Sequence, residues 1–175
     1  PENVTNDLLY QKLKSKKIKV FRGSENNVVL RFINTLEHFK SNHFIRVCAD
    51  NPYTCHNEIS RLVNVYSKNS LDYCYNNSPY GNYYPDGFGA EISSLKILKK
   101  IYHQTNTLER EHIFNHIKKK KKQFKIKTFN PLKKKYFLPY LSFEVNNKND
   151  YLKLNKLNIK WDLSMEEILE KYNEN

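Results

Sequence analysis

The sequence lacks long hydrophobic runs and has few cysteines. No apolar run approaches the roughly 18–20 residues that a helix needs to span a membrane, and no signal peptide is recognisable. Cys48, Cys55 and Cys74 form no CxxC pair. An odd number of cysteines without paired spacing is typical of reduced thiols in a cytosolic protein. We therefore expect a cytoplasmic protein with no membrane partner.

Glycine and acidic residues are also scarce. The 175 residues include 4 glycines against 13 tyrosines, and 18 acidic against 30 basic residues, so the net charge is +12. Lysine is concentrated at 12–19, 118–122 and 133–135. A positive field permits binding to polyanions but identifies no partner. Because lysine follows the same compositional bias as Asn, Ile and Tyr, we rank a nucleic-acid-binding module last among three interpretations.

The length suits one domain over residues 1–175. Strand and helix patterns alternate along the chain, which argues for crossover connections and an α/β fold with a mostly parallel sheet. Strands are predicted at 17–21, 43–49, 71–76, 88–92, 124–129 and 140–145. Helices are predicted at 4–14, 24–39, 56–66, 93–104, 108–117 (with Thr107 as its cap), 147–157 and from Ser164, where Glu167 completes a capping box.

One carboxylate stands where a predicted strand gives way to a helix. In "HFIRVCADNPY", Asp50 follows the apolar run 43–49. Ligands of open α/β sheets bind at the carboxyl ends of the strands, so Asp50 is placed to hold Mg²⁺ beside a nucleotide phosphate. The alternative is an Asp-Asn-Pro turn with no ligand. The residues alone leave both interpretations open.

Three other short motifs carry polar chemistry. "YPDGFGAEI" places Asp86 and Glu91 around a glycine-rich bend, suited to a metal or a polyhydroxyl substrate but also to a plain turn. "EREH" allows Glu109 and His112 to meet on one helical face, or is a solvated helix start. "FRGSENN" offers backbone amides and Ser24 at a helix N-terminus, as anion cradles do. Each motif alone is weak.

Taken in order, "KVFRGSENNVVLRF", "FIRVCADNPY", "YPDGFGAEI" and "EREHIFNHI" resemble the spore coat polysaccharide biosynthesis protein F family. This branch of the cytidylyltransferases includes the CMP-KDO and CMP-acylneuraminate synthetases. The resemblance covers the C-terminal two-thirds of the family pattern. It implies a Rossmann-like nucleotide-diphospho-sugar transferase fold, with a mostly parallel sheet flanked by helices. It also implies transfer of a cytidylyl group from CTP to a sugar or sugar acid for surface polysaccharide synthesis, with Mg²⁺ as cofactor.

The resemblance assigns roles to residues by position. Asp50 and Arg46 match catalytic positions, and Asp50 also matches a metal ligand. The other assignments are Arg22, Gly23 and Ser24 near the nucleotide, Asp86, Gly87 and Glu91 in a sugar-facing loop, and Glu109, Arg110, Glu111 and His112 near the substrate side. Family members often dimerise, so a homodimer is a further expectation.

The sequence departs from the family pattern at two places. The opening strand and the loop "R-x-x-S-x-R-L-P-x-K" are not present, so we expect an N-terminally incomplete domain whose chain alone does not catalyse the reaction. At the second metal position, Asn146 stands in place of an aspartate. An amide brings no charge, so Mg²⁺ binds weakly unless Glu144 or Asp150 compensates. The alternative function is therefore a catalytically degenerate homologue that binds a nucleotide-sugar or scaffolds a partner.

Overall fold

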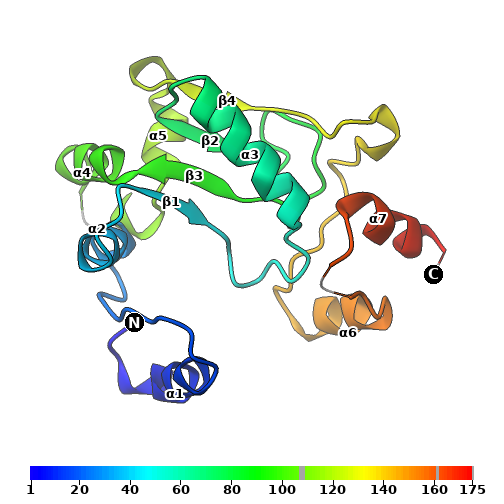
Figure 1. The fold of residues 1–175 in the computed structure, drawn as a ribbon, viewed down its shortest axis with the longest axis horizontal. Coiled ribbons are helices and arrows are strands. Elements are labelled where there is room, and N and C mark those ends of the chain that lie inside the picture. Colours follow the sequence, from blue (N-terminus) through cyan, green and yellow to red (C-terminus); the bar gives the residue numbers. More distant parts are fainter. Residues whose placement is uncertain (107–108, 161, 175) are drawn as a thin grey trace. The chain divides into compact units, whose positions relative to one another are not determined.

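A four-stranded sheet flanked by helices organises the chain, as the sequence predicts for an α/β fold (Figure 1). The computed structural model describes residues 1–106, 109–160 and 162–174. The predicted cap at Thr107 lies outside the described residues. The strands are β1 (His43–Arg46), β2 (Tyr73–Tyr75), β3 (Glu91–Ser94) and β4 (Ile126–Thr128), in the order β1-β3-β2-β4. Strands β2 and β4 pair in parallel, with Tyr73 opposite Ile126.

Seven helices lie along the described chain. They are α1 (Asp7–Ser15), α2 (Val28–His38), α3 (His56–Lys68), α4 (Leu95–Gln104), α5 (Asn115–Lys119), α6 (Lys148–Lys156) and α7 (Met165–Asn173), with 3₁₀ turns η1 (Val4–Asn6), η2 (Glu109–Glu111), η3 (Lys121–Gln123) and η4 (Lys134–Tyr136). Side-chain caps start four of the helices, α2, α4, α6 and α7. The predicted capping box of Ser164 and Glu167 is confirmed at α7. Asn147 and Asp150 form a second capping box, which starts α6.

The chain divides into two compact units. The first unit comprises residues 1–44 and 93–124, and the second comprises residues 45–92 and the chain from 125 onward. In the first unit α2 packs against α4, and the ring of Phe44 stacks on Phe114 with centroids 6.0 Å apart. The prediction of a single domain over 1–175 stays a prediction.

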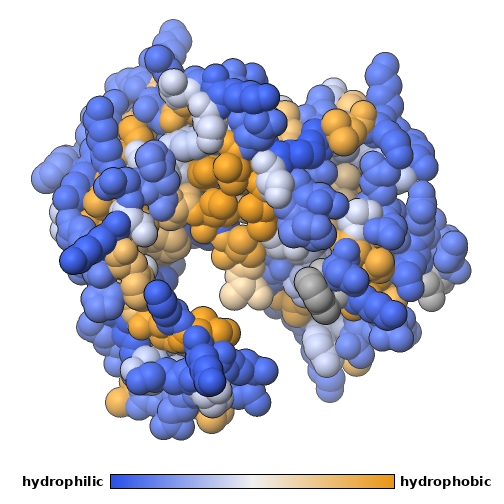
Figure 2. All heavy atoms as spheres, viewed as in Figure 1, coloured by the Kyte–Doolittle hydropathy of each residue, from blue (hydrophilic) through white to orange (hydrophobic). Residues whose placement is uncertain are grey.

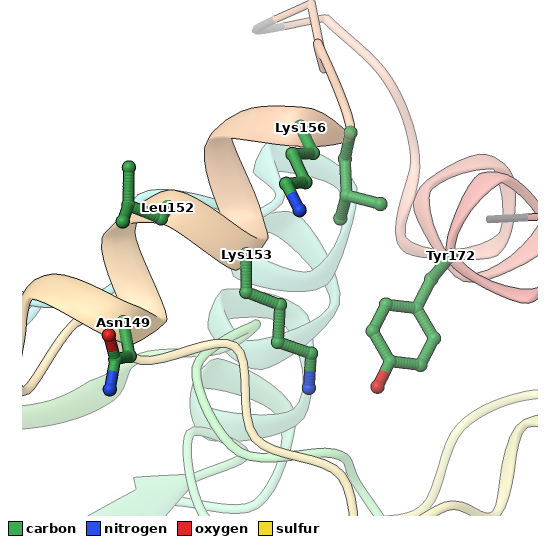
Figure 3. A pocket seen from close by; sticks show the side chains of 6 residues that line it. Asn149, Leu152, Lys153, Lys156 and Tyr172 are labelled. Carbon is green, nitrogen blue, oxygen red and sulfur yellow. The ribbon is translucent and has the colours of Figure 1, made fainter.

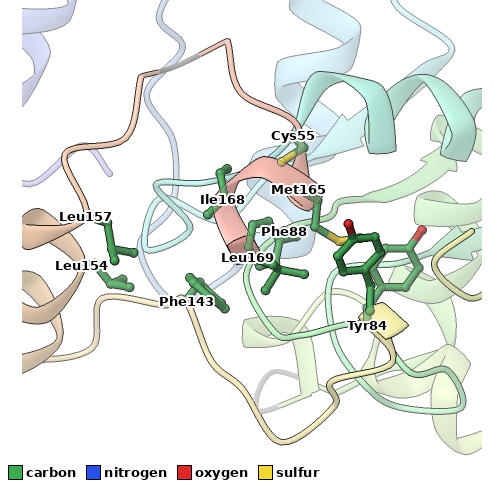
Figure 4. Packing of buried hydrophobic residues seen from close by; sticks show 10 residues of the cluster. Cys55, Tyr84, Phe88, Phe143, Leu154, Leu157, Met165, Ile168 and Leu169 are labelled. Atoms are coloured by element: carbon green, nitrogen blue, oxygen red, sulfur yellow. The ribbon is translucent and has the colours of Figure 1, made fainter. Parts of the chain in front are cut away.

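In the second unit, helix α3 covers one face of the strands (Figure 1). Leu62 and Tyr66 of α3 pack against Cys74, Ala90 and Ile92. A second cluster joins α6 and α7 to the loop between β2 and β3 and to the chain after β4, as Figure 4 shows. Its centre is Phe143, which lies 4.5 Å from Phe88 between ring centroids and is fully buried.

Several predicted strands are shorter than expected or wrong. The predicted strand 43–49 ends at Arg46, and β1 lies at one end of the four-stranded sheet with alternating exposure. The segment 17–21 is not a strand, because Ile18 N instead donates to Leu13 O and closes the end of α1. The segment 140–145 makes only a single parallel bridge, between Ser142 and Asp86. Apolar content predicted these strands, whereas a strand also requires a neighbouring backbone.

Hydrophilic side chains cover most of the face of the molecule that Figure 2 shows. Among the described residues, no helix combines the length and the apolar character required to cross a membrane.

Candidate functional site

Asp50 lies in a tight turn that follows β1. Asn51 N donates to Cys48 O at 3.2 Å, which places Ala49 and Asp50 at the corner of the turn. Within the described part of the chain, Asp50 Oδ1 is buried and accepts no hydrogen bond, and both side-chain polar atoms of Asn51 are in the same state. A buried carboxylate oxygen without a donor is costly, and a bound cation would relieve that cost. Asp50 thus lies in a turn that begins at Cys48, and its role as a metal ligand stays a prediction.

A hydrogen bond brings the second predicted metal position next to this turn. Val145 N donates to Asp50 O at 2.8 Å, so residues 144–146 run beside residue 50. Asn146 Nδ2 lies 3.4 Å from Glu144 Oε2. Glu144 and Asn146 face a cavity of about 410 Å³ that Asp50 does not line; its lining residues are Tyr140, Leu141, Ser142, Glu144, Asn146, Asp150, Lys153 and Leu154. The structure thus brings together the segments that carry Asp50 and Asn146.

The pKa of the Cys48 thiol is shifted by burial and by the charged side chains of the same region. Burial raises the pKa of Cys48, Arg46 opposes the rise, and the carboxylates of Glu91, Asp50 and Glu144 add to it. One side chain therefore feels the charges of Arg46, Glu91, Asp50 and Glu144 together. Three carboxylates close to one arginine form a polar region suited to a cation or to a cation-bound phosphate.

The oxygen ligands present fit a Mg²⁺ ion that retains water. Among the described residues, no group of three or more His, Cys, Asp or Glu side chains is arranged to hold a metal ion. Mg²⁺ is commonly bound by one or two carboxylates together with substrate phosphates. Two carboxylates and one amide, those of Asp50, Glu144 and Asn146, lie on the two segments that the backbone hydrogen bond brings together. Asp150 is less suited, because its Oδ2 accepts from the backbone N of Asn146 and Asn147 at the start of α6.

Arg46 is held by a buried carboxylate that is held in turn by a tyrosine. Arg46 Nη1 donates to Glu91 Oε2, and the Tyr73 hydroxyl donates to Glu91 Oε1. Burial opposes the charge of Arg46, but Glu91 outweighs it and raises the pKa of the guanidinium. Burial, reinforced by Glu91, raises the pKa of Tyr73 far above its ordinary value, so its hydroxyl stays a donor. The sequence offered no signal for Tyr73, because it depends on the order of the strands.

Asp86 and Gly87 pack their backbone against the segment that lines this cavity. Asp86 N donates to Leu141 O at 2.9 Å, and Phe143 N donates to Asp86 O at 3.0 Å. Gly87 has φ +97°, and a Cβ there would lie 3.0 Å from the carbonyl carbon of Phe143. The positive φ and the close approach of the Phe143 backbone are therefore sufficient to explain glycine at position 87. The predicted contact of both residues with a sugar stays a prediction.

In the first unit, Arg22 makes internal contacts. Its guanidinium donates to Asp7 Oδ1 at 2.7 Å, Pro1 O at 2.9 Å and Asn3 O at 2.8 Å. A Cβ at Gly23 would lie 3.0 Å from Arg31 Cγ, and Ser24 Oγ accepts from Asn27 N at 3.0 Å. These contacts fasten the N-terminal segment ahead of α2. A role in nucleotide binding stays a prediction for all three residues.

The "EREH" motif lies partly on a polar cavity. Glu109 and His112 line about 340 Å³ of space together with Asn106, Asn115, His116 and Lys119. The predicted helix over 108–117 is instead the turn η2 followed by α5. Arg110 donates to Tyr102 O at 2.9 Å and Thr105 O at 2.8 Å, so its side chain binds carbonyls at the end of α4. Burial lowers the pKa of His116 in the same cavity.

A basic cavity lies between α6 and α7, and the sequence analysis missed it. It measures about 540 Å³ and is lined by Asn149, Leu152, Lys153, Lys156, Leu157 and Tyr172. Figure 3 shows Lys153 and Tyr172 extending toward one another, and the ammonium lies 5.0 Å from the ring centroid. The spacing of 149, 152, 153 and 156 on one face of α6 was the available signal. Among the described residues, its lining includes two lysines and no carboxylate.

Comparisons with known proteins agree with the family resemblance. No family model matches the chain. Spore coat polysaccharide biosynthesis protein SpsF of Bacillus subtilis is 25% identical over 151 residues, which cover 84% of this chain and 60% of that protein. An uncharacterized protein of Methanocaldococcus jannaschii is 28% identical over 110 residues, covering 62% of this chain and 43% of that protein. The chain therefore spans about half the length of the curated relatives it matches.

A solved structure shows the fold. The structure of a cytidylyltransferase from Leptospira borgpetersenii serovar Hardjo-bovis matches 99% of this chain and 74% of its own, with a TM-score of 0.88 and 19% identity. The chain has the fold of that cytidylyltransferase. Together with the SpsF relative, this confirms the resemblance to the cytidylyltransferases.

Proposed function

We propose that this protein is a cytidylyltransferase that transfers a cytidylyl group from CTP to a sugar or sugar acid for surface polysaccharide synthesis. The observation that carries the proposal is the buried oxygen of Asp50, which lacks a donor within the described residues and lies beside the segment 144–146. The SpsF relative and the cytidylyltransferase fold support the reaction class.

The proposed chemistry needs position and charge more than covalent catalysis. An oxygen of the sugar attacks the α-phosphorus of CTP, and pyrophosphate leaves with the electron pair of the broken bond. Such transfers depend mainly on alignment and on neutralising the phosphate charge. Arg46 is one basic side chain of this region, and a third of its side chain is exposed. Its role is to bind a phosphate oxygen of the nucleotide.

Asp50, with Glu144 and Asn146, would hold the Mg²⁺ that the reaction class implies. Bound Mg²⁺ supplies charge neutralisation for the triphosphate. Asp50 keeps a carboxylate oxygen free of protein donors for that purpose. In the same proposal Asp86 and Gly87 contact the sugar, and the active protein is a cytoplasmic homodimer.

A degenerate homologue is the second candidate, and Asn146 favours it. An amide at that position leaves the region with one carboxylate fewer than the family pattern. Such a protein binds a CMP-sugar without turning it over. A degenerate homologue would have the same Arg46 region and the same nucleotide preference as an active cytidylyltransferase, but a lower affinity for Mg²⁺.

Thermal unfolding of the whole chain tests the proposal. CTP with Mg²⁺ at about 100 times Kd adds about 2.7 kcal/mol of stability, which is several degrees in Tm for a chain of this size. The proposal predicts that shift. A shift with a CMP-sugar and no turnover of CTP supports the degenerate homologue. A shift with RNA that falls steeply with salt, and none with CTP, would refute both.

A further inference from the structure

Three neighbouring strands each contribute one side chain to a buried chain of hydrogen bonds. Arg46 lies on β1, Glu91 on β3 and Tyr73 on β2, and the sheet order places these strands side by side. Both oxygens of the Glu91 carboxylate are occupied, one by Arg46 and one by Tyr73. The Tyr73 residue is fully buried and the Glu91 side chain is 3% exposed, so neither reaches a ligand in solvent.

The guanidinium of Arg46 is the only member of this trio with donors to spare. It makes one hydrogen bond within the described chain, to Glu91. An arginine has five N–H donors, so most of them remain available. With 33% of its side chain exposed, Arg46 presents them to a ligand. The buried carboxylate of Glu91 therefore holds the guanidinium of Arg46 through Nη1 and leaves its other N–H groups available to an anion.

A second trio in the same unit has the same chemistry, but its arginine makes more contacts with the protein than Arg46 does. The Tyr84 hydroxyl donates to the buried Glu58, which also pairs with Arg61. Arg61 further donates to Tyr84 Oη at 2.8 Å and to Asn130 O at 3.1 Å, and it lies over the ring of Phe129. The guanidinium of Arg61 is thus held by contacts within the protein on several sides. The comparison separates a trio that only stabilises the fold from one that also presents a charged group.

We propose that Glu91 and Tyr73 are positioning residues that hold the Arg46 guanidinium in place to bind a phosphate group. This inference rests on the proposed function, in which that phosphate belongs to the nucleotide. It reassigns Glu91 from the predicted sugar contact to support of Arg46. Tyr73 holds the carboxylate of Glu91, and Glu91 holds the guanidinium of Arg46. The Arg46 side chain therefore has less conformational freedom to lose when the ligand binds, and this preorganisation favours binding.

The test compares Tyr73→Phe with Tyr84→Phe in the whole chain. Each substitution removes one hydroxyl that donates to a buried glutamate and leaves the ring packing intact. Three measurements are made on each variant: urea unfolding, the mobility of the arginine Nε–Hε group by ¹⁵N relaxation, and calorimetric titration with inorganic pyrophosphate and with CTP plus Mg²⁺.

Both variants are expected to lose similar stability, because the two hydroxyls are equally buried. Only Tyr73→Phe should mobilise Arg46 and weaken pyrophosphate and CTP binding, by on the order of tenfold. Equal anion affinity in the two variants would overturn the inference, as would an unchanged Arg46 Nε signal in Tyr73→Phe. If the wild type binds pyrophosphate but not CTP, the proposed function fails, and the pyrophosphate affinities still decide the role of Tyr73 and Glu91.

Discussion

At the scale of single residues, position 146 sets how strongly the region attracts a divalent cation. Asn146 lies beside Glu144 and lines the same cavity. Replacing it by aspartate adds a charged oxygen ligand next to Asp50, so Asn146→Asp should tighten Mg²⁺ binding by about tenfold or more in a calorimetric titration. Asn149→Asp adds the same charge three residues away, on the wall of the basic cavity, and should change Mg²⁺ affinity little. Equal effects of the two variants would contradict the assignment.

The sequence and its family resemblance selected Asp50, Arg46 and Asn146 as candidate site residues. They did not reveal the side chains that hold Arg46, and the structure shows why. The strand-to-helix junction and the Asp-Asn-Pro turn are local, so Asp50 could be placed from its neighbours. Glu91 lies 45 residues after Arg46 and 18 residues after Tyr73 in the sequence. Their contacts therefore depend on the order of three strands. Arg22 and Arg110 looked like ligand-binding groups, and their internal contacts could not be read from spacing.

At the scale of elements, the start of α7 has a charge-dependent cap. Glu167 accepts from both the hydroxyl and the backbone N of Ser164 at 2.7 Å, and these bonds lower the pKa of its carboxyl, the side-chain bond most. A lowered folded-state pKa means that ionised Glu167 stabilises the fold above its ordinary value of 4.5, and that this stability is lost as the pH falls through the lowered value. Glu167→Gln should therefore be less stable than wild type at pH 7.

Urea unfolding at a series of pH values measures this difference. The deficit of Glu167→Gln should shrink as the pH falls below 4.5. Ser164→Ala removes the donor hydroxyl and should reduce the effect of Glu167→Gln in the double variant. A deficit of the same size at pH 7 and pH 3 would show that the cap does not depend on the charge of Glu167.

Caps were predictable because they are local, whereas strands were not. Ser164 and Glu167 are three residues apart, and their capping box was read from the sequence and is present. The apolar segments 71–76 and 124–129 became β2 and β4 because they pair in parallel with each other. Segment 140–145 has comparable apolar content but forms a single bridge, between Ser142 and Asp86, and no described strand pairs with it. A hydrophobic run becomes a strand only when the tertiary fold gives it a partner.

At the scale of the whole molecule, part of the positive charge has a structural use. Lys133 pairs with Glu166 at 2.8 Å and Lys135 with Glu170 at 3.4 Å, so the run 133–135 fastens η4 to α7. This accounts for one of the three lysine clusters without a polyanion. Under the proposed function, the remaining positive charge attracts the phosphates of the nucleotide.

A titration of Mg²⁺ in the presence of CTP, comparing wild type with Asp50→Asn, tests the central claim most directly. Asp162→Asn is the control, because it removes one exposed carboxylate from the same unit. The account predicts that Asp50→Asn folds with undiminished stability in the absence of ligand, since it removes the negative charge of a carboxylate whose buried oxygen has no donor. It also predicts that Asp50→Asn loses most Mg²⁺-dependent CTP binding. Wild-type affinity in Asp50→Asn, or an equal loss in Asp162→Asn, would contradict it.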